Sequence, residues 1–206
     1  LRSPHLRHVP DAAASPSKRV TRAVPDGGFI EAHTDLVKKL DYECELAVVL
    51  GKDAKDVPAG QTKDYVFGYT ILNDVSARDV QTAHKQWYFG KSLDGFTPIG
   101  PCIVTADEFD TYPPKLPIRC FVNGEKRQDS NTGLQIFDID HVIAELSQGM
   151  TLKAGTIIAP GGRRHGHGAA LLPQTGRRSS LRDRGHRHPD EHSPLSKSYS
   201  VLYYFS

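Results

Sequence analysis

Three acidic side chains near the middle of the sequence have the types and the spacing to hold a metal ion. Glu43 and Glu45 are two residues apart in the apolar run 42–51, whose composition is typical of a β-strand. Because side chains alternate across a strand, both carboxylates should lie on one face. Asp74 closely follows a second apolar run, residues 65–72, and so stands near the end of another expected strand. Carboxylate oxygens grouped in this way are the ligands that Mg2+, Mn2+ and Ca2+ prefer.

Each of these features also has a simpler interpretation. Acidic residues two apart on a strand are more often the solvated face of a sheet than a metal site. Lys91, the next candidate along the chain, could be an ordinary surface lysine. Its Gly-Lys-Ser context is not a phosphate-binding loop, because no glycine precedes it at the required spacing. The aromatic run 87–89 could edge a pocket or fill the core.

The surrounding pattern predicts the elements that would position these side chains. Residues 73–79 read as a polar turn that leads into a short helix. Residues 116–122 and 125–128 flank an Asn-Gly pair, which favours a two-residue hairpin turn. Apolar residues with helical spacing predict a helix over 136–146 that stops at the following Gln-Gly pair. Short strands with few helices predict a mainly β fold with some α.

The overall composition indicates one catalytic domain in a reducing compartment. The chain has 206 residues, a formal net charge of +2 and three cysteines without the spacing of a disulfide framework or a zinc site. A nearly balanced charge is not typical of a nucleic-acid binder, and no apolar run is long enough to cross a membrane. We therefore expect no nucleic-acid partner, no membrane partner and a cytoplasmic location, with mitochondria as the alternative compartment.

Three segments resemble the fumarylacetoacetate hydrolase (FAH) family in their order and spacing. They are residues 41–52 (DYECELAVVLGK), 68–79 (GYTILNDVSARD) and 86–96 (QWYFGKSLDGF). Shorter matches follow, so that the resemblance covers residues 31–159. Several blocks in one order are hard to obtain by chance, and on this basis the sequence is identified as similar to the FAH catalytic domain.

The resemblance implies a mixed β-sheet roll or sandwich around a metal site. Glu43, Glu45 and Asp74 fall on the metal ligands of the family, which implies Mg2+, with Mn2+ or Ca2+ as alternatives. Lys91 falls on a catalytic lysine that lines the substrate pocket, and Gln81 falls on a substrate-binding glutamine. The implied assembly is a homodimer.

The activity that the resemblance implies is metal-dependent chemistry on a 1,3-dicarbonyl or 2-oxo acid. Acylpyruvates, oxaloacetate and fumarylacetoacetate are the expected substrate types. Hydrolysis, decarboxylation and isomerisation remain open, through cleavage of a C–C bond or tautomerisation of an enol. A metal would stabilise the developing enolate in each case.

One departure from the family pattern affects the expected activity. The family carries a His-x-x-Glu pair in a lid before the first ligand strand, but no such pair precedes Glu43. The sequence has this pair only at His188 and Glu191, near the end of the chain. An alternative to an active enzyme is therefore a catalytically impaired relative that binds metal only.

The composition changes in the last quarter of the sequence, where seven arginines accompany one acidic residue between Arg163 and Arg187. Read one nucleotide later with suitable codons, this segment gives strings like those of the family, so we interpret it as out of frame. The expected organisation is a disordered or aberrant arm at 1–18, the FAH-type core at 19–159 and an aberrant basic tail at 160–206. A further alternative, a basic-tailed nucleic-acid binder, depends on that tail alone.

Overall fold

The computed structural model describes residues 17–161 and the backbone of residues 201–204. The strands are β1 (Leu40–Asp41), β2 (Cys44–Leu50), β3 (Val66–Asn73), β4 (Ser76–Ala77), β5 (Ile99–Thr105), β6 (Pro117–Val122), β7 (Glu125–Asn131), β8 (Ile157–Ile158) and β9 (Val201–Tyr204). The helices are α1 (Arg78–Ala83), α2 (Trp87–Lys91) and α3 (Ile139–Gly149), with 3-10 turns η1 (Thr62–Tyr65), η2 (Ala106–Glu108) and η3 (Thr132–Leu134). The expected class, mainly β with some α, is confirmed.

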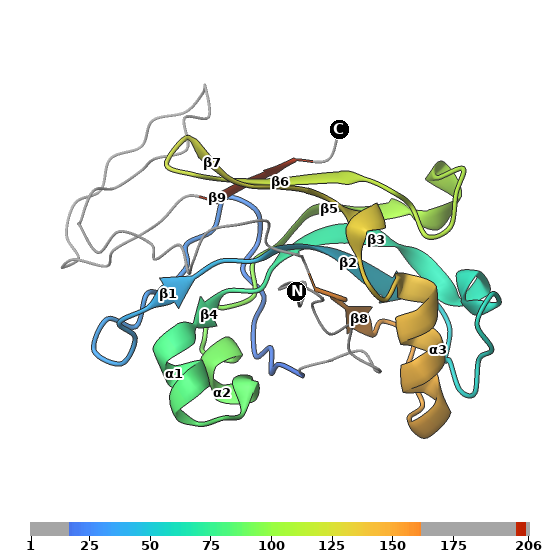
Figure 1. Cartoon of the computed structure of the whole chain (residues 1–206), viewed down its shortest axis with the longest axis horizontal. Helices are drawn as coiled ribbons and strands as arrows, with labels where there is room; N and C mark the ends of the chain where they lie inside the picture. The colour runs from blue at the N-terminus through green and yellow to red at the C-terminus, as the bar shows by residue number, and fades with distance from the viewer. Residues whose placement is uncertain (1–16, 162–200, 205–206) are drawn as a thin grey trace, which may run out of the picture.

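The strands form three sheets, which Figure 1 shows in layers. A four-stranded sheet has the order β5-β3-β2-β8, and a three-stranded sheet, β7-β6-β9, lies over it. β1 and β4 form a short pair from which α1 continues, with α2 beside it. The two expected strands are therefore confirmed as β2 and β3, adjacent and antiparallel in the larger sheet. Glu45 lies in β2, whereas Glu43 comes directly before β2 and Asp74 directly after β3.

Alternation along β2 separates a core face from a site face. Its even-numbered residues, from Cys44 to Leu50, belong to the two apolar clusters of the core, whereas Glu45 lies on the opposite face. One cluster joins β2 and β3 to β6, and the other joins them to α3. Each fully buried aliphatic side chain in these clusters contributes roughly 1.5–3 kcal/mol to folding. The core thus fixes the strand from which the glutamates project.

The predicted hairpin is confirmed as β6 and β7. Asn123 and Gly124 join the two strands, and their φ angles of 54° and 80° are those that the two-residue turn needs. On its other side β6 pairs with β9, which lies in the segment interpreted as out of frame. Most of the predicted arm and tail, residues 1–16, 162–200 and 205–206, lies outside the described residues.

The helix expected at 136–146 is present as α3, but it begins three residues later than predicted. Asp138 caps its first turn, because the side-chain carboxylate accepts a hydrogen bond from the backbone N of His141 over 2.9 Å. Ile136, counted in the apolar stripe, is half exposed before the helix begins. α3 has 11 residues, and within the described part of the chain no helix is long and apolar enough to cross a membrane.

A buried hydroxyl joins the loop after β2 to α3. Thr62 is fully buried and donates to Asp140 Oδ1 over 2.5 Å. Because its single proton is committed to that bond, Thr62 accepts from the hydroxyl of Tyr112, which is also 2.5 Å away. Asp140 additionally accepts from the backbone N of Gly60. The network ties three separate segments of the chain together.

Replacing Thr62 with valine is expected to lower the free energy of unfolding by about 1–3 kcal/mol, because Tyr112 and Asp140 lose a buried partner. Urea denaturation of the metal-free protein measures the difference. Thr82→Val is the matched control, since the Thr82 hydroxyl is exposed on α1 and its loss should cost less than about 0.5 kcal/mol. Equal losses in the two variants would contradict the role given to the buried hydroxyl.

Candidate metal centre

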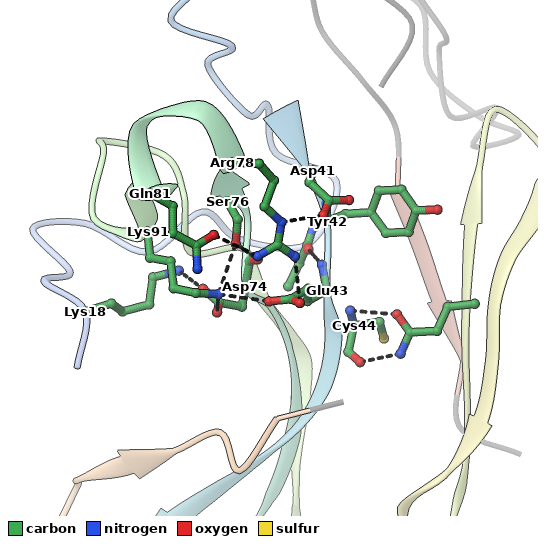
Figure 2. Close-up of polar contacts among 12 residues, drawn as sticks. Lys18, Asp41, Tyr42, Glu43, Cys44, Asp74, Ser76, Arg78, Gln81 and Lys91 are labelled. Atoms are coloured by element: carbon green, nitrogen blue, oxygen red, sulfur yellow. Dashed lines mark hydrogen bonds and ion pairs between the residues drawn. The ribbon is translucent and has the colours of Figure 1, made fainter. Parts of the chain in front are cut away.

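The acidic site forms where β2 begins and β3 ends. The antiparallel register places Cys44 opposite Asn73, which brings Glu43 and Glu45 beside Asp74. Each of the three carboxylates offers an oxygen, and these oxygens lie within 4.8 Å of one another. The three residues predicted from the sequence are therefore brought together, and Figure 2 shows two of them, Glu43 and Asp74, with their polar contacts.

Backbone hydrogen bonds hold the two ligand segments in place. Asp74 N donates to Glu43 O over 2.8 Å, and Glu43 N donates to the side-chain oxygen of Asn73 over 3.1 Å. Asn73 is fully buried, so its amide is shielded from competition with water. The separation of Glu43 from Asp74 is thus set by one main-chain bond and by one bond to the Asn73 side chain.

Lys91 reaches the site from α2. An added Cβ on Gly90 would lie 2.7 Å from the backbone N of Gln81, so only glycine lets α2 approach α1 this closely. The next residue, Lys91, then directs its Nζ to Glu43 Oε2 at 2.8 Å and also to a carboxylate oxygen of Asp74. The side chain is 5 % exposed, so the interpretation as a surface lysine is wrong.

The Lys91 ammonium is held in its charged form. Burial on its own would lower its pKa, but the negative charges of Asp74 and Glu43 outweigh that effect and raise the pKa above its ordinary value. Ser76 Oγ accepts a third hydrogen bond from Nζ over 3.0 Å. All three protons of the ammonium group therefore have acceptors within the site.

Arg78, at the start of α1, connects the acidic group to the predicted substrate-binding glutamine. Its guanidinium contacts Asp41 Oδ2 at 2.6 Å and Glu43 Oε1 at 2.7 Å. A third nitrogen donates to Gln81 Oε1 over 2.9 Å. Since the amide oxygen of Gln81 faces Arg78, the direction of its NH2 group is fixed as well.

Lys18 is a member of the site that the sequence pattern did not indicate. Its Nζ donates to Asp74 Oδ1 over 2.6 Å (Figure 2) and to the carbonyl oxygen of Phe96, also over 2.6 Å. Burial lowers its pKa despite the attraction of Asp74. Lys18 is the last residue of the expected arm and lies 56 residues before Asp74, so no local spacing relates the two.

Glu45 carries the strongest electrostatic signature of the site. Burial, followed by repulsion from Asp74 and Glu43, raises its pKa from an ordinary 4.5 to about 8. Lys91 and a hydrogen bond from the Gly161 backbone act in the opposite direction. A divalent cation among three hard oxygen donors would remove this repulsion, so the donor set fits Mg2+, Mn2+ or Ca2+.

The aromatic run 87–89 lies at the surface of the protein. Trp87, Tyr88 and Phe89 of α2 are 42–47 % exposed, so they do not fill the core. Two histidines that come before and after the second ligand segment, His33 and His84, bond through their rings to the backbone oxygens of Asp94 and Val80. The three cysteines are free thiols, with Cys44 and Cys120 buried and Cys102 exposed.

Comparison with known proteins gives one family and several relatives. A family model described as fumarylacetoacetate (FAA) hydrolase C-terminal matches residues 3–187. The oxaloacetate tautomerase YisK of Bacillus subtilis is 46% identical over 135 residues, which are 66% of this chain and 44% of YisK.

Solved structures give a consistent result. Fumarylacetoacetate hydrolase from Exiguobacterium antarcticum is 47% identical with a TM-score of 0.64, over 66% of this chain and 49% of its own. Fumarylpyruvate hydrolase from Pseudomonas aeruginosa, in complex with Mn2+ and pyruvate, is 30% identical with a TM-score of 0.61, over 68% of this chain and 61% of its own. This chain spans about half the length of the curated relatives it matches.

Proposed function

The chain belongs to the fumarylacetoacetate hydrolase family, and from that premise we propose that it binds a divalent cation and acts there on a 2-oxo acid. The observation that carries the proposal is the convergence of Glu43, Glu45 and Asp74, whose oxygens lie within 4.8 Å of one another. Mg2+ is the proposed ion, with Mn2+ and Ca2+ as alternatives. We also retain the homodimer and the cytoplasmic location as proposals.

Charge around the carboxylates favours an anionic substrate. Lys18, Lys91 and Arg78 each place a cationic nitrogen within 2.8 Å of a carboxylate of the site. A divalent ion would satisfy the carboxylates and so leave these nitrogens able to attract the carboxylate group of a substrate. A 2-oxo acid also offers two adjacent oxygens, one from the carboxylate and one from the ketone.

A bound divalent cation would supply Lewis-acid polarisation of a substrate carbonyl oxygen. Lys91 would contribute a fixed positive charge beside the reacting oxygens, because its raised pKa keeps the ammonium protonated at neutral pH. Gln81, with its amide orientation fixed by Arg78, would donate a hydrogen bond that positions the substrate. These roles suit both C–C bond cleavage and enol tautomerisation.

Two relatives support this substrate class. YisK is named as an oxaloacetate tautomerase, and the Pseudomonas aeruginosa structure holds Mn2+ and pyruvate in a fumarylpyruvate hydrolase. We therefore propose oxaloacetate and acylpyruvates such as fumarylpyruvate as the first substrates to test, with fumarylacetoacetate next. All are small oxo acids with a carbonyl beside or near a carboxylate.

The proposal is tested by measuring metal binding and turnover separately on the full chain. Calorimetric titration should show one Mg2+ or Mn2+ site per chain. With that ion present, ultraviolet absorbance should follow enol–keto conversion of oxaloacetate or cleavage of an acylpyruvate. Binding without turnover of any of these substrates would support the catalytically impaired alternative, and turnover that survives complete metal removal would overturn the metal-dependent proposal.

A further inference from the structure

Gln128 carries a polar side chain at the single buried position of β7. The strand register places it opposite Cys120, in the layer between the two larger sheets. An apolar side chain would be the ordinary choice there, because a buried amide costs free energy unless it is hydrogen-bonded. The residue type therefore requires an explanation in terms of what the amide contacts.

Both polar atoms of the Gln128 amide bond to the main chain of one residue of β2. Nε2 donates to Cys44 O over 2.7 Å, and Oε1 accepts from Cys44 N over 3.1 Å; the dashed lines at Cys44 in Figure 2 mark these bonds. They reproduce the pair of bonds that a neighbouring strand would make. Within the described part of the chain, β8 pairs only with Val48 and Val49, so Gln128 serves a stretch of β2 that β8 does not reach.

Cys44 is the single residue between Glu43 and Glu45. Its backbone angles therefore set the orientation of the two carboxylates relative to each other. Asn73 and Asp74 hold the Glu43 backbone from the side of β3. Gln128 holds the next residue from the opposite sheet. The pair of glutamates is therefore fixed from two independent directions.

We infer that Gln128 is a positioning residue for the metal site, acting through the main chain of Cys44 on both glutamates. The inference rests on the proposed function, since it concerns how that same site holds its ion. Residues that orient metal ligands typically change metal affinity by about 10–100-fold when they are replaced. Mg2+ demands near-ideal octahedral geometry, whereas Ca2+ tolerates irregular coordination, so loosened glutamates should weaken Mg2+ binding more than Ca2+ binding.

The test uses Gln128→Met, which keeps the length and bulk of the side chain and removes both hydrogen bonds. Mg2+ and Ca2+ are each titrated into the metal-free full chain by calorimetry. The variant is expected to bind Mg2+ about 10–100-fold more weakly than the wild type, with a smaller loss for Ca2+. This change in the ratio of the two affinities is a readout that a general loss of stability would not produce.

Thr132→Val is the matched control. Thr132 follows β7 directly, is also buried, and makes the same two kinds of main-chain bond, donating to Pro114 O over 2.7 Å and accepting from Leu116 N over 2.8 Å. This variant should lose stability as Gln128→Met does, but it should bind Mg2+ like the wild type. An equal loss of Mg2+ affinity in both variants would overturn the positioning role.

The remaining outcomes separate this inference from the proposed function. If Gln128→Met folds and keeps the wild-type affinity for Mg2+ and Ca2+, the positioning role is refuted. The assignment of the metal site is then unaffected. A wild type that binds neither ion refutes the proposed function and the inference with it. If Gln128→Met does not fold, Gln128→Leu replaces it; this variant also removes both the acceptor for Cys44 N and the donor for Cys44 O, and the same loss is expected.

Discussion

Asp74→Asn is expected to weaken Mg2+ binding at least about 100-fold, which corresponds to about 3 kcal/mol. The substitution preserves the size of the side chain but removes one of three anionic ligands, and affinity for hard cations depends on the number of charged ligands. It also leaves Lys18 and Lys91 without their shared acceptor charge, so two ammonium groups would repel the incoming ion more strongly. Calorimetric titration of the purified variant measures the loss.

Asp79→Asn is the control for this experiment. Asp79 stands five residues further on, and its carboxylate accepts from the backbone N of Lys38 and Lys39 without touching the acidic site. That variant should bind Mg2+ as the wild type does. If Asp74→Asn also kept the wild-type affinity, the assignment of Asp74 as a ligand would be wrong.

Metal binding at neutral pH is expected to release close to one proton per ion. In the metal-free protein burial and the neighbouring carboxylates raise the pKa of Glu45 to about 8, so Glu45 is largely protonated at pH 7 and must ionise to bind a cation. Below pH 8, the apparent affinity for the ion should therefore rise about tenfold for each unit by which the pH increases. Above pH 8 it should level off. Titration calorimetry in two buffers of different ionisation enthalpy counts the protons.

The same shift gives the metal-free protein a defined pH dependence of stability. The pKa of Glu45 is higher in the folded state than its ordinary value, so its contribution to stability is fully present below pH 4.5 and is lost as the pH rises through about 8. Each unit of such a shift is worth about 1.4 kcal/mol, so the loss across this window amounts to a few kcal/mol. Saturating Mg2+ should remove most of this pH-dependent loss of stability.

Glu45→Gln provides the control for both effects. A neutral amide cannot titrate, so its metal-free stability should lack the fall between pH 4.5 and pH 8, and any residual metal binding should release no proton. Thermal unfolding across the pH range gives the first result and calorimetry the second. Wild-type protein that binds Mg2+ at pH 7 with no proton release would contradict the electrostatic account of this residue.

The sequence was most informative where a local pattern and a local structure coincide. β2 and the hairpin turn at Asn123 and Gly124 follow from alternation and from the tolerance of positive φ, both of which act within a few residues. The beginning of α3 was misplaced because the apolar stripe continues past its true start. Capping by Asp138 decides where the helix begins, and the spacing of apolar residues does not contain that signal.

Only those residues of the candidate site that stand in family-like segments could be predicted from the sequence. Glu43, Glu45 and Asp74 stand in recognisable segments, and the structure brings their carboxylates together. Lys18 and Gln128 have no such signal, because each contacts a residue more than 50 positions away through a single side chain. Contacts of that range depend on how the sheets stack, which neither composition nor periodicity determines.

The two ammonium groups on Asp74 also bear on how the ion would enter. Lys18 and Lys91 each place an ammonium group on Asp74, so the chain supplies its own counter-ions to the acidic cluster. Loading would then be an ion exchange inside a folded protein, in which a divalent cation displaces ammonium groups from shared oxygens. Such a site behaves unlike a zinc finger, whose fold collapses when the metal is removed. Its occupancy would follow the supply of free Mg2+, so that the cation supply could switch the site without unfolding the chain.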